Sequence, residues 1–311
     1  MKIDSGIINI NKPEGLTSHD VVSLVRKKLG IKRVGHTGTL DPMATGVLPI
    51  CFGKATRIIE YLDYDFKSYN CDLLLGISTD TLDVTGEILG KKSFSHVTEE
   101  MINKVFNYFL GDIMQVPPKY SALKVNGRRL YDYARKGEDV EIKSRETHIE
   151  SIDINRIDLN EGKVNFNVKC SKGTYIRSIC RDVGDMLDTY GTMSSLVRTS
   201  SGIFEIYDSI NLEDFKDIDL ESIVDLIKAV DYPLTNLGKC TMEMEYSKRF
   251  LHGQRIANRN VNKIVETNIP KSYAMYVDDI KSNEFLGIAL YEEENNCYKA
   301  TKVIGVIDEN I

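Results

Sequence analysis

Long apolar stretches are missing from this 311-residue chain. No run of about 18 consecutive apolar residues occurs, which excludes a membrane-spanning helix. The first ten residues, MKIDSGIINI, contain one Lys followed by an Asp, without the apolar segment or the small-residue cleavage site of a secretory signal. We therefore expect a cytoplasmic protein without a membrane partner.

Clustered metal ligands are missing as well. The five His residues are scattered singly, with no H-E-x-x-H pattern, and no two of the six Cys residues have C-x-x-C spacing. We expect neither a structural zinc nor a cofactor, and any catalysis should proceed without a protein-bound metal. Well-separated cysteines in such a chain are typical of reduced, mostly buried thiols. They are Cys51, Cys71, Cys170, Cys180, Cys240 and Cys297.

Positive charge is in overall deficit, since the net charge is −6, and this argues against nucleic acid as a partner. The charge is unevenly distributed, however. Residues 1–57 contain nine Lys and Arg against four Asp and Glu, and residues 119–145 contain eight against four. Residues 205–232 reverse the balance, with two against nine. Because a polyanion senses charge within a Debye length of about 8–10 Å, the basic regions permit an RNA partner, although solvated charged faces explain them equally well.

Hydrophobic patterns predict strands and helices of unequal length, which favours an α/β or α+β fold over a regular parallel array. Ser18 is predicted to be the N-cap of a helix that Gly30 ends. Further helices are predicted over 54–62, 97–109 and 175–187 and within 205–232, and strands over 6–10, 69–75, 147–158 and 163–170.

The last part of the chain differs in pattern from the rest. A boundary is predicted at residues 232–233, and the following residues contain the short β-like runs YAMYVDD, FLGIALYEEE and YKATKVIGVID. They predict a small β-rich module. Segment 117–140 stands out for another reason, because it is polar, basic and rich in turns, with tyrosines interspersed.

The most unusual segment is the loop GHTGTLDPMATG at residues 35–46. Its glycines and small residues allow another molecule to approach the backbone closely. Asp41 is its only carboxylate and precedes a proline that restricts it to extended geometry. Neither G-x-G-x-x-G nor G-x-x-x-x-G-K-[ST] fits the loop, so a phosphate-binding loop is not supported. The residues alone are equally consistent with a tight turn in which Asp41 caps a neighbouring element.

The run GHTGTLDPMATGVLPI closely resembles the catalytic motif of the TruB family, the tRNA pseudouridine-55 synthases. The resemblance covers nearly the whole chain, through GIINI and KPEGLTS near the start, KSYNCDLLLGISTDTLDVTG, GTYIRS, and SSLVRTSSG near residue 200. It implies an α+β pseudouridine synthase fold over residues 1–234, with a mixed, largely antiparallel central sheet flanked by helices. Residues 235–311 would form a small β-rich, PUA-type RNA-binding domain.

The implied activity is the isomerisation of uridine to pseudouridine at position 55 in the T-loop of tRNA. By this resemblance Asp41 is the catalytic carboxylate, acting as nucleophile or as base. Arg177 would pair with Asp41 and keep it ionised in a pocket whose dryness raises carboxyl pKa values. Tyr69 would stack on the base and is a candidate acceptor for the carbon-5 proton. Without the resemblance, Arg177 is a surface arginine and Tyr69 a packing strand residue.

Three further residues match the family's substrate site. Leu196 corresponds to an apolar wall of the pocket, and His36 to a residue that helps to prise the target nucleotide out of its loop. Lys12 corresponds to a lysine that helps to hold the active-site loops. Asp80 and Asp83 could imitate a pair of acid and base carboxylates, but turn capping is the preferred interpretation.

The resemblance names the T-arm of tRNA as the partner and requires no obligatory protein partner. The target uridine would be flipped into the pocket, and segment 117–140 corresponds to a loop that closes over the RNA. Residues 278–311 contain eight Asp and Glu against three Lys, so RNA contacts of the last module are expected at 248–249 and 255–259. Two alternatives remain, a guide-RNA-dependent, dyskerin-like synthase and a non-catalytic tRNA-binding or tRNA-folding protein on the same scaffold. A glycosidase would require two flanking carboxylates, and only Asp41 is placed by a specific motif.

Overall fold

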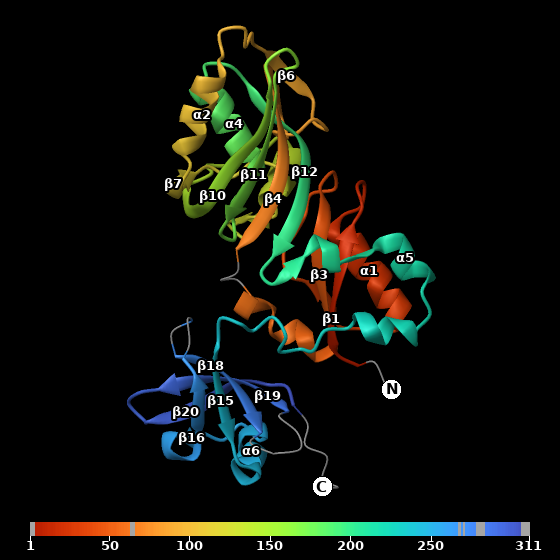
Figure 1. Ribbon diagram of the computed structural model, residues 1–311, viewed down its shortest axis with the longest axis vertical. Helices are drawn as coiled ribbons and strands as arrows, with labels where there is room; N and C mark the ends of the chain where they lie inside the picture. Colours follow the sequence, from red (N-terminus) through yellow and green to blue (C-terminus); the bar gives the residue numbers. More distant parts are fainter. Residues whose placement is uncertain (1–3, 63–65, 267–268, 270, 278–283, 306–311) are drawn as a thin grey trace.

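The computed structural model describes residues 4–62, 66–266, 269, 271–277 and 284–305. The chain is elongated, with a large sheet and its helices at one end and a smaller sheet at the other (Figure 1). No helix in the described ranges is long and apolar enough to cross a membrane. All six cysteines are buried and free, as predicted.

The large sheet has the strand order β14-β1-β3-β12-β4-β11-β10-β7, with β2 paired to β3 and β13 to β12. The pairs β1–β14 and β3–β12 are parallel, and the other pairs are antiparallel. The predicted mixed, largely antiparallel sheet is therefore confirmed. Its strands are β1 (Gly6–Lys12), β2 (Val34–His36), β3 (Thr45–Phe52), β4 (Lys67–Leu75), β7 (Gly111–Gln115), β10 (Arg145–Asp158), β11 (Lys163–Cys170), β12 (Gly191–Ser201), β13 (Phe204–Glu205) and β14 (Ile210–Asn211).

Four helices pack on this sheet. Helices α1 (Ser18–Leu29) and α5 (Leu212–Asp217) lie beside β1 and β3, and α2 (Glu99–Asn107) and α4 (Ile176–Met186) lie beside β4, β10 and β12 (Figure 1). The apolar faces of α1, α2 and α4 join the strands in one continuous core. Because β12 pairs with both β3 and β4, it joins the two halves of the sheet.

Helix α1 begins one residue earlier than expected. Its N-cap is Thr17, which forms a capping box with Asp20, and Gly30 ends the helix in the left-handed conformation with φ 67°. Ser18 is therefore the first helical residue and not the cap. Its buried hydroxyl instead bonds to both the N–H and the C=O of Leu40, at 2.8 and 3.1 Å, and so attaches the helix to the 35–46 loop.

One other prediction was wrong in element type. Residues 54–62 form two short 3₁₀ helices, η1 (Gly53–Arg57) and η2 (Ile59–Leu62), in place of one α-helix. Gly53 begins η1 with φ 59°, and the segment shares an apolar cluster with the smaller sheet. The acidic helix predicted within 205–232 is confirmed as α5, and the stretch also contains β14 and the 3₁₀ helices η3 (Ile206–Asp208) and η4 (Ser222–Leu226).

The smaller sheet confirms the predicted β-rich module. Its order is β16-β20-β19-β18-β15-β17, and helix α6 (Met244–Leu251) packs on it. The strands are β15 (Gly238–Met242), β16 (Ile256–Ala257), β17 (Asn262–Val265), β18 (Ser272–Val277), β19 (Phe285–Glu292) and β20 (Cys297–Val303). The ends of two β-like runs, at 278–279 and 306–308, lie outside the described residues.

The smaller sheet shares an apolar cluster with η1, η2 and the outer side of β1 and β3. Polar bonds reinforce this contact. Lys54 donates to the carbonyl of Ile304 at 2.8 Å, and Arg57 to that of Val303 at 2.5 Å. Lys302 forms an ion pair with Glu60. The module therefore packs directly against the large sheet.

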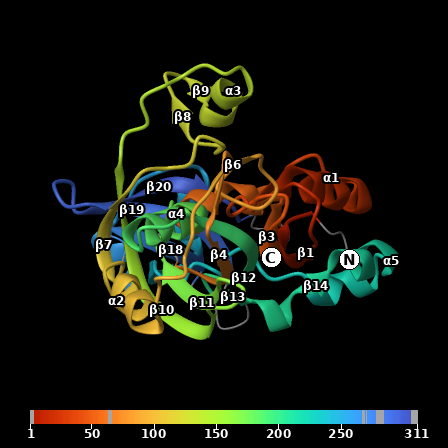
Figure 2. The same ribbon diagram turned by 90° about the horizontal axis from the view of Figure 1, so that it is seen from above.

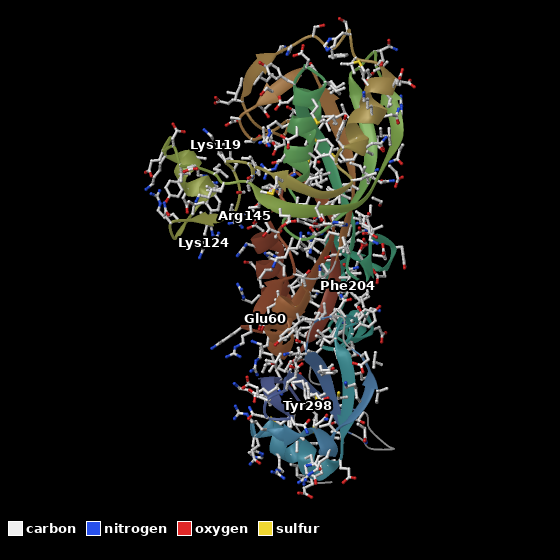
Figure 3. The ribbon with its side chains drawn as sticks, turned by 90° about the vertical axis from the view of Figure 1, so that its left-hand side faces the viewer. Glu60, Lys119, Lys124, Arg145, Phe204 and Tyr298 are labelled. Atoms are coloured by element: carbon white, nitrogen blue, oxygen red, sulfur yellow. The ribbon has the colours of Figure 1, made fainter. Side chains whose placement is uncertain are left out.

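Segment 117–140 projects from the body of the molecule (Figures 2 and 3). It contains a two-stranded hairpin, β8 (Lys124–Val125) and β9 (Arg128–Arg129), followed by helix α3 (Leu130–Arg135). Arginines cover its tyrosine rings, with Arg128 4.2 Å from the centre of the Tyr133 ring. A second hairpin, β5 (Ile77–Thr79) and β6 (Ile88–Lys91), follows β4 and contacts β12.

Candidate active site

Asp41 lies in the loop between β2 and β3. The loop returns into β3 at Gly46, whose φ is 102° and whose absent side chain leaves room for the backbone of Arg198 on β12. Ser18 holds Leu40, and the ammonium of Lys12 donates to the carbonyl of Pro42 at 3.2 Å. Asp41 is thus anchored on both sides.

Lys12 lies completely buried beneath this loop at the end of β1. Besides Pro42 it bonds to the carbonyls of Pro13 and Leu16, at 2.9 and 2.7 Å. Burial lowers the pKa of Lys12 to about 8, although the nearby Asp41 carboxylate opposes the change. Lys12 does not line the pocket described below, so its contacts are those of a residue that supports the loop.

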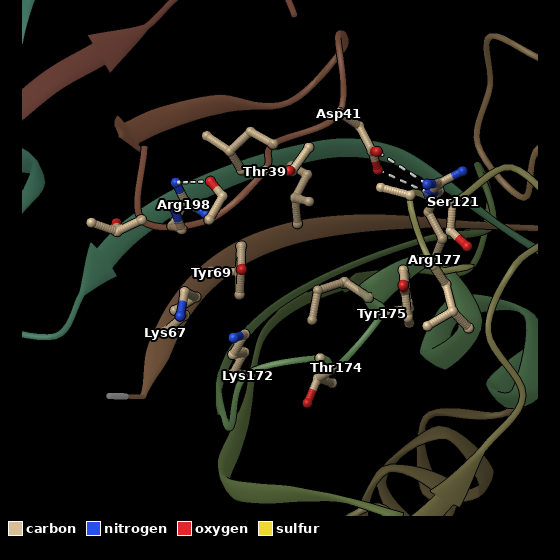
Figure 4. Close-up of a pocket in the computed structure, with 18 residues that line it drawn as sticks. Thr39, Asp41, Lys67, Tyr69, Ser121, Lys172, Thr174, Tyr175, Arg177 and Arg198 are labelled. Atoms are coloured by element: carbon tan, nitrogen blue, oxygen red, sulfur yellow. Dashed lines mark hydrogen bonds and ion pairs between the residues drawn. The ribbon is translucent and has the colours of Figure 1, made fainter. Parts of the chain in front are cut away.

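The guanidinium of Arg177 faces the carboxylate of Asp41 and contacts it through two nitrogen atoms (Figure 4). Its Nε lies 2.9 Å from Asp41 Oδ2, and its Nη2 donates to Asp41 Oδ1 at 3.1 Å. Two parallel bonds fix both the distance and the plane of the carboxylate. Arg177 is presented by the first turn of α4, and Gln115 bonds both to the N–H and to the C=O of Tyr175 just before that helix.

The remaining donors of Arg177 are occupied too. It donates to the carbonyls of Thr81 and Tyr120, at 2.9 and 3.0 Å, and its Nη1 lies 3.5 Å from Asp83 Oδ2. Asp83 caps a turn through Thr85, as predicted, but it also faces the guanidinium, which the sequence did not indicate. Asp80 caps the same hairpin, accepting from the N–H of Glu87 at 2.8 Å.

Two opposing effects set the charge of Asp41. Burial raises the pKa of its carboxyl, and Arg177 acts against that rise through its charge and its hydrogen bond. Asp83 adds a smaller upward contribution. The side chain of Asp41 is still 33% exposed, because it faces an open pocket, whereas that of Arg177 is 6% exposed. Arg177 is therefore a fixed part of the protein interior, and it holds the Asp41 carboxylate at the boundary between that interior and the pocket.

The pocket beside Asp41 has a volume of about 280 Å³, near the lower limit of about 300 Å³ for small-molecule sites. Tyr69 on β4 and Leu196 on β12 lie in its wall, so the structure brings the predicted Asp41, Tyr69, Arg177 and Leu196 together. The pocket also contains three basic residues that the sequence did not single out, although alternation along β4 and β12 places two of them on the face of Tyr69. They are Lys67, Lys172 and Arg198.

His36 lies outside this group. It belongs to β2, does not line the pocket, and packs edge-on against His19 with ring centres 5.6 Å apart. Burial lowers the pKa of His36 to about 4, so its ring is neutral near pH 7. Its Nδ1 is buried without a hydrogen-bond partner among the described residues.

Comparisons with known proteins agree with this geometry. Residues 26–176 match the TruB family pseudouridylate synthase N-terminal domain, and residues 177–235 match the tRNA pseudouridylate synthase B C-terminal domain. A protein of Alkaliphilus oremlandii named tRNA pseudouridine synthase B is 42% identical over 98% of this chain and 99% of its own length. One of the same name from Clostridium kluyveri is 46% identical over 93% of this chain and 96% of its own length.

Solved structures with the same fold include Cbf5 in a Cbf5-Nop10-Gar1 complex. The TM-score is 0.76 at 28% identity, over 98% of this chain and 86% of that one. A Nop10-Cbf5 complex of the archaeal box H/ACA sRNP gives 0.74 at 25% identity, over 98% and 87%.

The sheet, the paired Asp41 and Arg177 and these matches define a pseudouridine synthase, an isomerase. Within that class, the chain belongs to the TruB family.

Proposed function

We propose that this protein isomerises uridine to pseudouridine at position 55 in the T-loop of tRNA, without guide RNA or protein partners. The observation that carries the proposal is the two-bonded contact of Asp41 with Arg177 at the mouth of a pocket walled by Tyr69 and Leu196. The names of the full-length relatives, tRNA pseudouridine synthase B, support tRNA as the substrate.

Isomerisation requires the bond between the ribose and the base nitrogen to break and a bond to carbon-5 to form. A duplex or a stacked loop hides both atoms, so the uridine must leave the stack, at a cost of a few kcal/mol. Stacking on the Tyr69 ring offsets part of that cost, by about 1–3 kcal/mol. Leu196 on β12 lies opposite Cys71, two residues along β4 from Tyr69, so it extends the same wall with an apolar surface.

Asp41 acts on the reacting nucleotide, as nucleophile or as base, and must be ionised to do either. Burial favours its neutral form and raises its pKa, and the charge and hydrogen bond of Arg177 oppose that rise. Because all the donors of Arg177 are occupied within the protein, its guanidinium cannot follow the substrate. The site is therefore organised before RNA binds, which is the arrangement that electrostatic catalysis requires.

The projecting segment 117–140 is proposed to contact the RNA. Its residues Ser121, Ala122 and Leu123 form part of the pocket wall, and Arg177 bonds to the adjacent Tyr120 carbonyl. Phosphate contacts by the basic residues of this segment would be sensitive to salt. We also propose that residues 235–311 are a PUA-type RNA-binding domain and that the protein acts in the cytoplasm.

The test uses purified protein and an unmodified T-arm stem-loop, with no other macromolecule, followed by mapping of pseudouridine. Product at the T-loop uridine, absent with Asp41→Asn, is the expected result. A stem-loop with cytidine at that position is the matched control. Failure of the wild type on both the stem-loop and whole tRNA would contradict the proposal.

The guide-dependent alternative has one observation in its favour, namely that the similar solved structures are Cbf5 complexes with Nop10. It predicts no product until guide RNA and partner proteins are added. A non-catalytic tRNA-binding protein predicts a tight T-arm complex with no product under either condition.

A further inference from the structure

Arg198 has no part in the mechanism above, although it is completely buried beside the pocket. It lies on β12 directly opposite Tyr69 on β4 in the antiparallel register. Residues opposite each other in such a pair project from the same face of the sheet. Figure 4 shows both side chains at the end of the pocket away from Arg177.

Two hydrogen bonds hold the guanidinium of Arg198 in place. Its Nε donates to the carbonyl of Val47 at 2.6 Å, and its Nη2 donates to that of Gly38 at 3.1 Å. Its Nη1 is buried and has no hydrogen-bond partner among the described residues. A rigid, permanently charged group inside a pocket, whose Nη1 makes no hydrogen bond to any described residue, is a preformed site for negative charge.

We propose that Arg198 is a positioning residue for the isomerisation, whose Nη1 stabilises the phenolate of Tyr69 while that oxygen takes the proton from carbon-5 of the base. The inference rests on the proposed function and takes Tyr69, the candidate acceptor implied by the family resemblance, as the group that receives this proton.

The proton balance closes without another reactant. The hydrogen on carbon-5 of uridine is replaced in pseudouridine by the ribose, and the base nitrogen gains a hydrogen. The Tyr69 phenol gives its proton to that nitrogen once the bond to the ribose has broken. After the new carbon–carbon bond forms, the phenolate takes the carbon-5 proton and the C–H electron pair returns to the ring. The phenol is then restored, and nothing is oxidised or reduced.

The groups around Tyr69 show why a positive charge is needed there. Burial raises the pKa of Tyr69, and Cys170 on β11 and Asp41 in the catalytic loop raise it further. Arg198 opposes all three. Lys67, two residues along β4, and Lys172, just after β11, also line the pocket, but neither is the register partner of Tyr69.

The first experiment measures single-turnover rates with T-arm RNA containing either uridine or uridine deuterated at carbon-5. We expect Arg198→Gln to slow turnover about 10²-fold, as removal of a charge-stabilising donor does, and to increase the deuterium isotope effect. Arg198→Lys keeps the charge and should recover at least tenfold of that loss. If Arg198→Gln is folded and its isotope effect equals that of the wild type, Arg198 does not act on carbon-5 proton transfer.

A double-mutant cycle separates action through Tyr69 from a general structural effect. If Arg198 acts through the phenol, Tyr69→Phe combined with Arg198→Gln loses no more activity than Tyr69→Phe alone. Lys172→Gln, which removes another positive charge from the same pocket, should add its own effect to that of Tyr69→Phe. Additive losses for Arg198→Gln would overturn the proposal.

A titration without RNA distinguishes failure of this inference from failure of the proposed function. Protein containing 3-fluorotyrosine is titrated by fluorine NMR, and the signal that disappears in Tyr69→Phe identifies the residue. Arg198→Gln should move its ionisation upward by at least one pH unit, and Lys172→Gln by less. An unchanged titration would overturn the inference even in an active enzyme, whereas an inactive wild type with the expected shift would contradict only the function.

Discussion

Replacement of Asp41 by Asn removes the charge of one carboxylate and almost none of its volume. Arg177 would lose one of its two contacts at 2.9 and 3.1 Å, because the amide of Asn keeps a single acceptor oxygen, and it would keep the carbonyls of Thr81 and Tyr120 and the facing Asp83. The guanidinium therefore stays paired, and the pocket wall should remain in place. We expect turnover to fall by at least about 10³-fold, equivalent to about 4 kcal/mol of transition-state stabilisation. RNA affinity should change by less than about tenfold, or ~1.4 kcal/mol.

The same substitution should not destabilise the fold at neutral pH. Because burial raises the pKa of Asp41, the folded chain binds this proton more tightly than the unfolded chain. Asp41 therefore contributes stability that is fully present below its unfolded pKa of about 3.8 and is lost as pH rises through the folded value. Asparagine is neutral throughout and avoids that loss. The expected variant is catalytically dead and at least as stable as the wild type at pH 7.

The assay pairs single-turnover kinetics and RNA binding with urea unfolding at pH 4 and pH 7. The stability difference in favour of Asp41→Asn should be larger at pH 7 than at pH 4. Turnover within tenfold of the wild type would refute the catalytic role. A loss of stability above about 3 kcal/mol, typical of a broken buried ion pair, would show that the carboxylate holds the fold together.

Further predictions concern the groups around Asp41. Arg177→Ala should lower turnover at least about 10²-fold and RNA affinity far less, and RNA-binding assays beside single-turnover rates will show whether affinity alone is lost. The folded chain releases the Lys12 proton near pH 8 and the unfolded chain near 10.5, so the free energy of unfolding should rise with pH across that interval. Lys12→Met should flatten the rise in denaturant titrations. His36 should titrate near pH 4 in proton NMR, and because the unfolded value is near 6.5, acidification from pH 6.5 to 4 should cost stability. A His36 ring that titrates near 6.5 would contradict its burial.

Much of the fold follows from local patterns, and the departures have local causes. Strands 147–158 and 163–170 and the helix at 175–187 were predicted within two residues, because alternation and amphipathic spacing are strong there. The single helix predicted over 54–62 is wrong because that segment packs against residues far along the chain, near Ile304. A contact across about 250 positions leaves no signature in either local sequence.

The candidate site was predicted only in part, for a related reason. Resemblance supplied Asp41, Tyr69 and Arg177, and their proximity emerges from the order of β3, β12 and β4. Arg198 gives no signal in the sequence, because nothing in the local pattern of a strand arginine indicates complete burial. The turn contact of Asp83 follows from its local sequence, but its second contact, with Arg177, depends on where α4 packs.

Strand β12, which joins the two halves of the large sheet, restricts how a nucleotide can enter the pocket. Tyr69, Leu196 and Arg198 are carried by β4 and β12, which are hydrogen-bonded to each other along their length. That side of the pocket is therefore rigid. The stretch 121–123 also lines the pocket but belongs to no strand of the large sheet. We therefore expect the pocket to open at 121–123. Exchange of backbone amide hydrogens should be fast in this stretch and slow in β4 and β12.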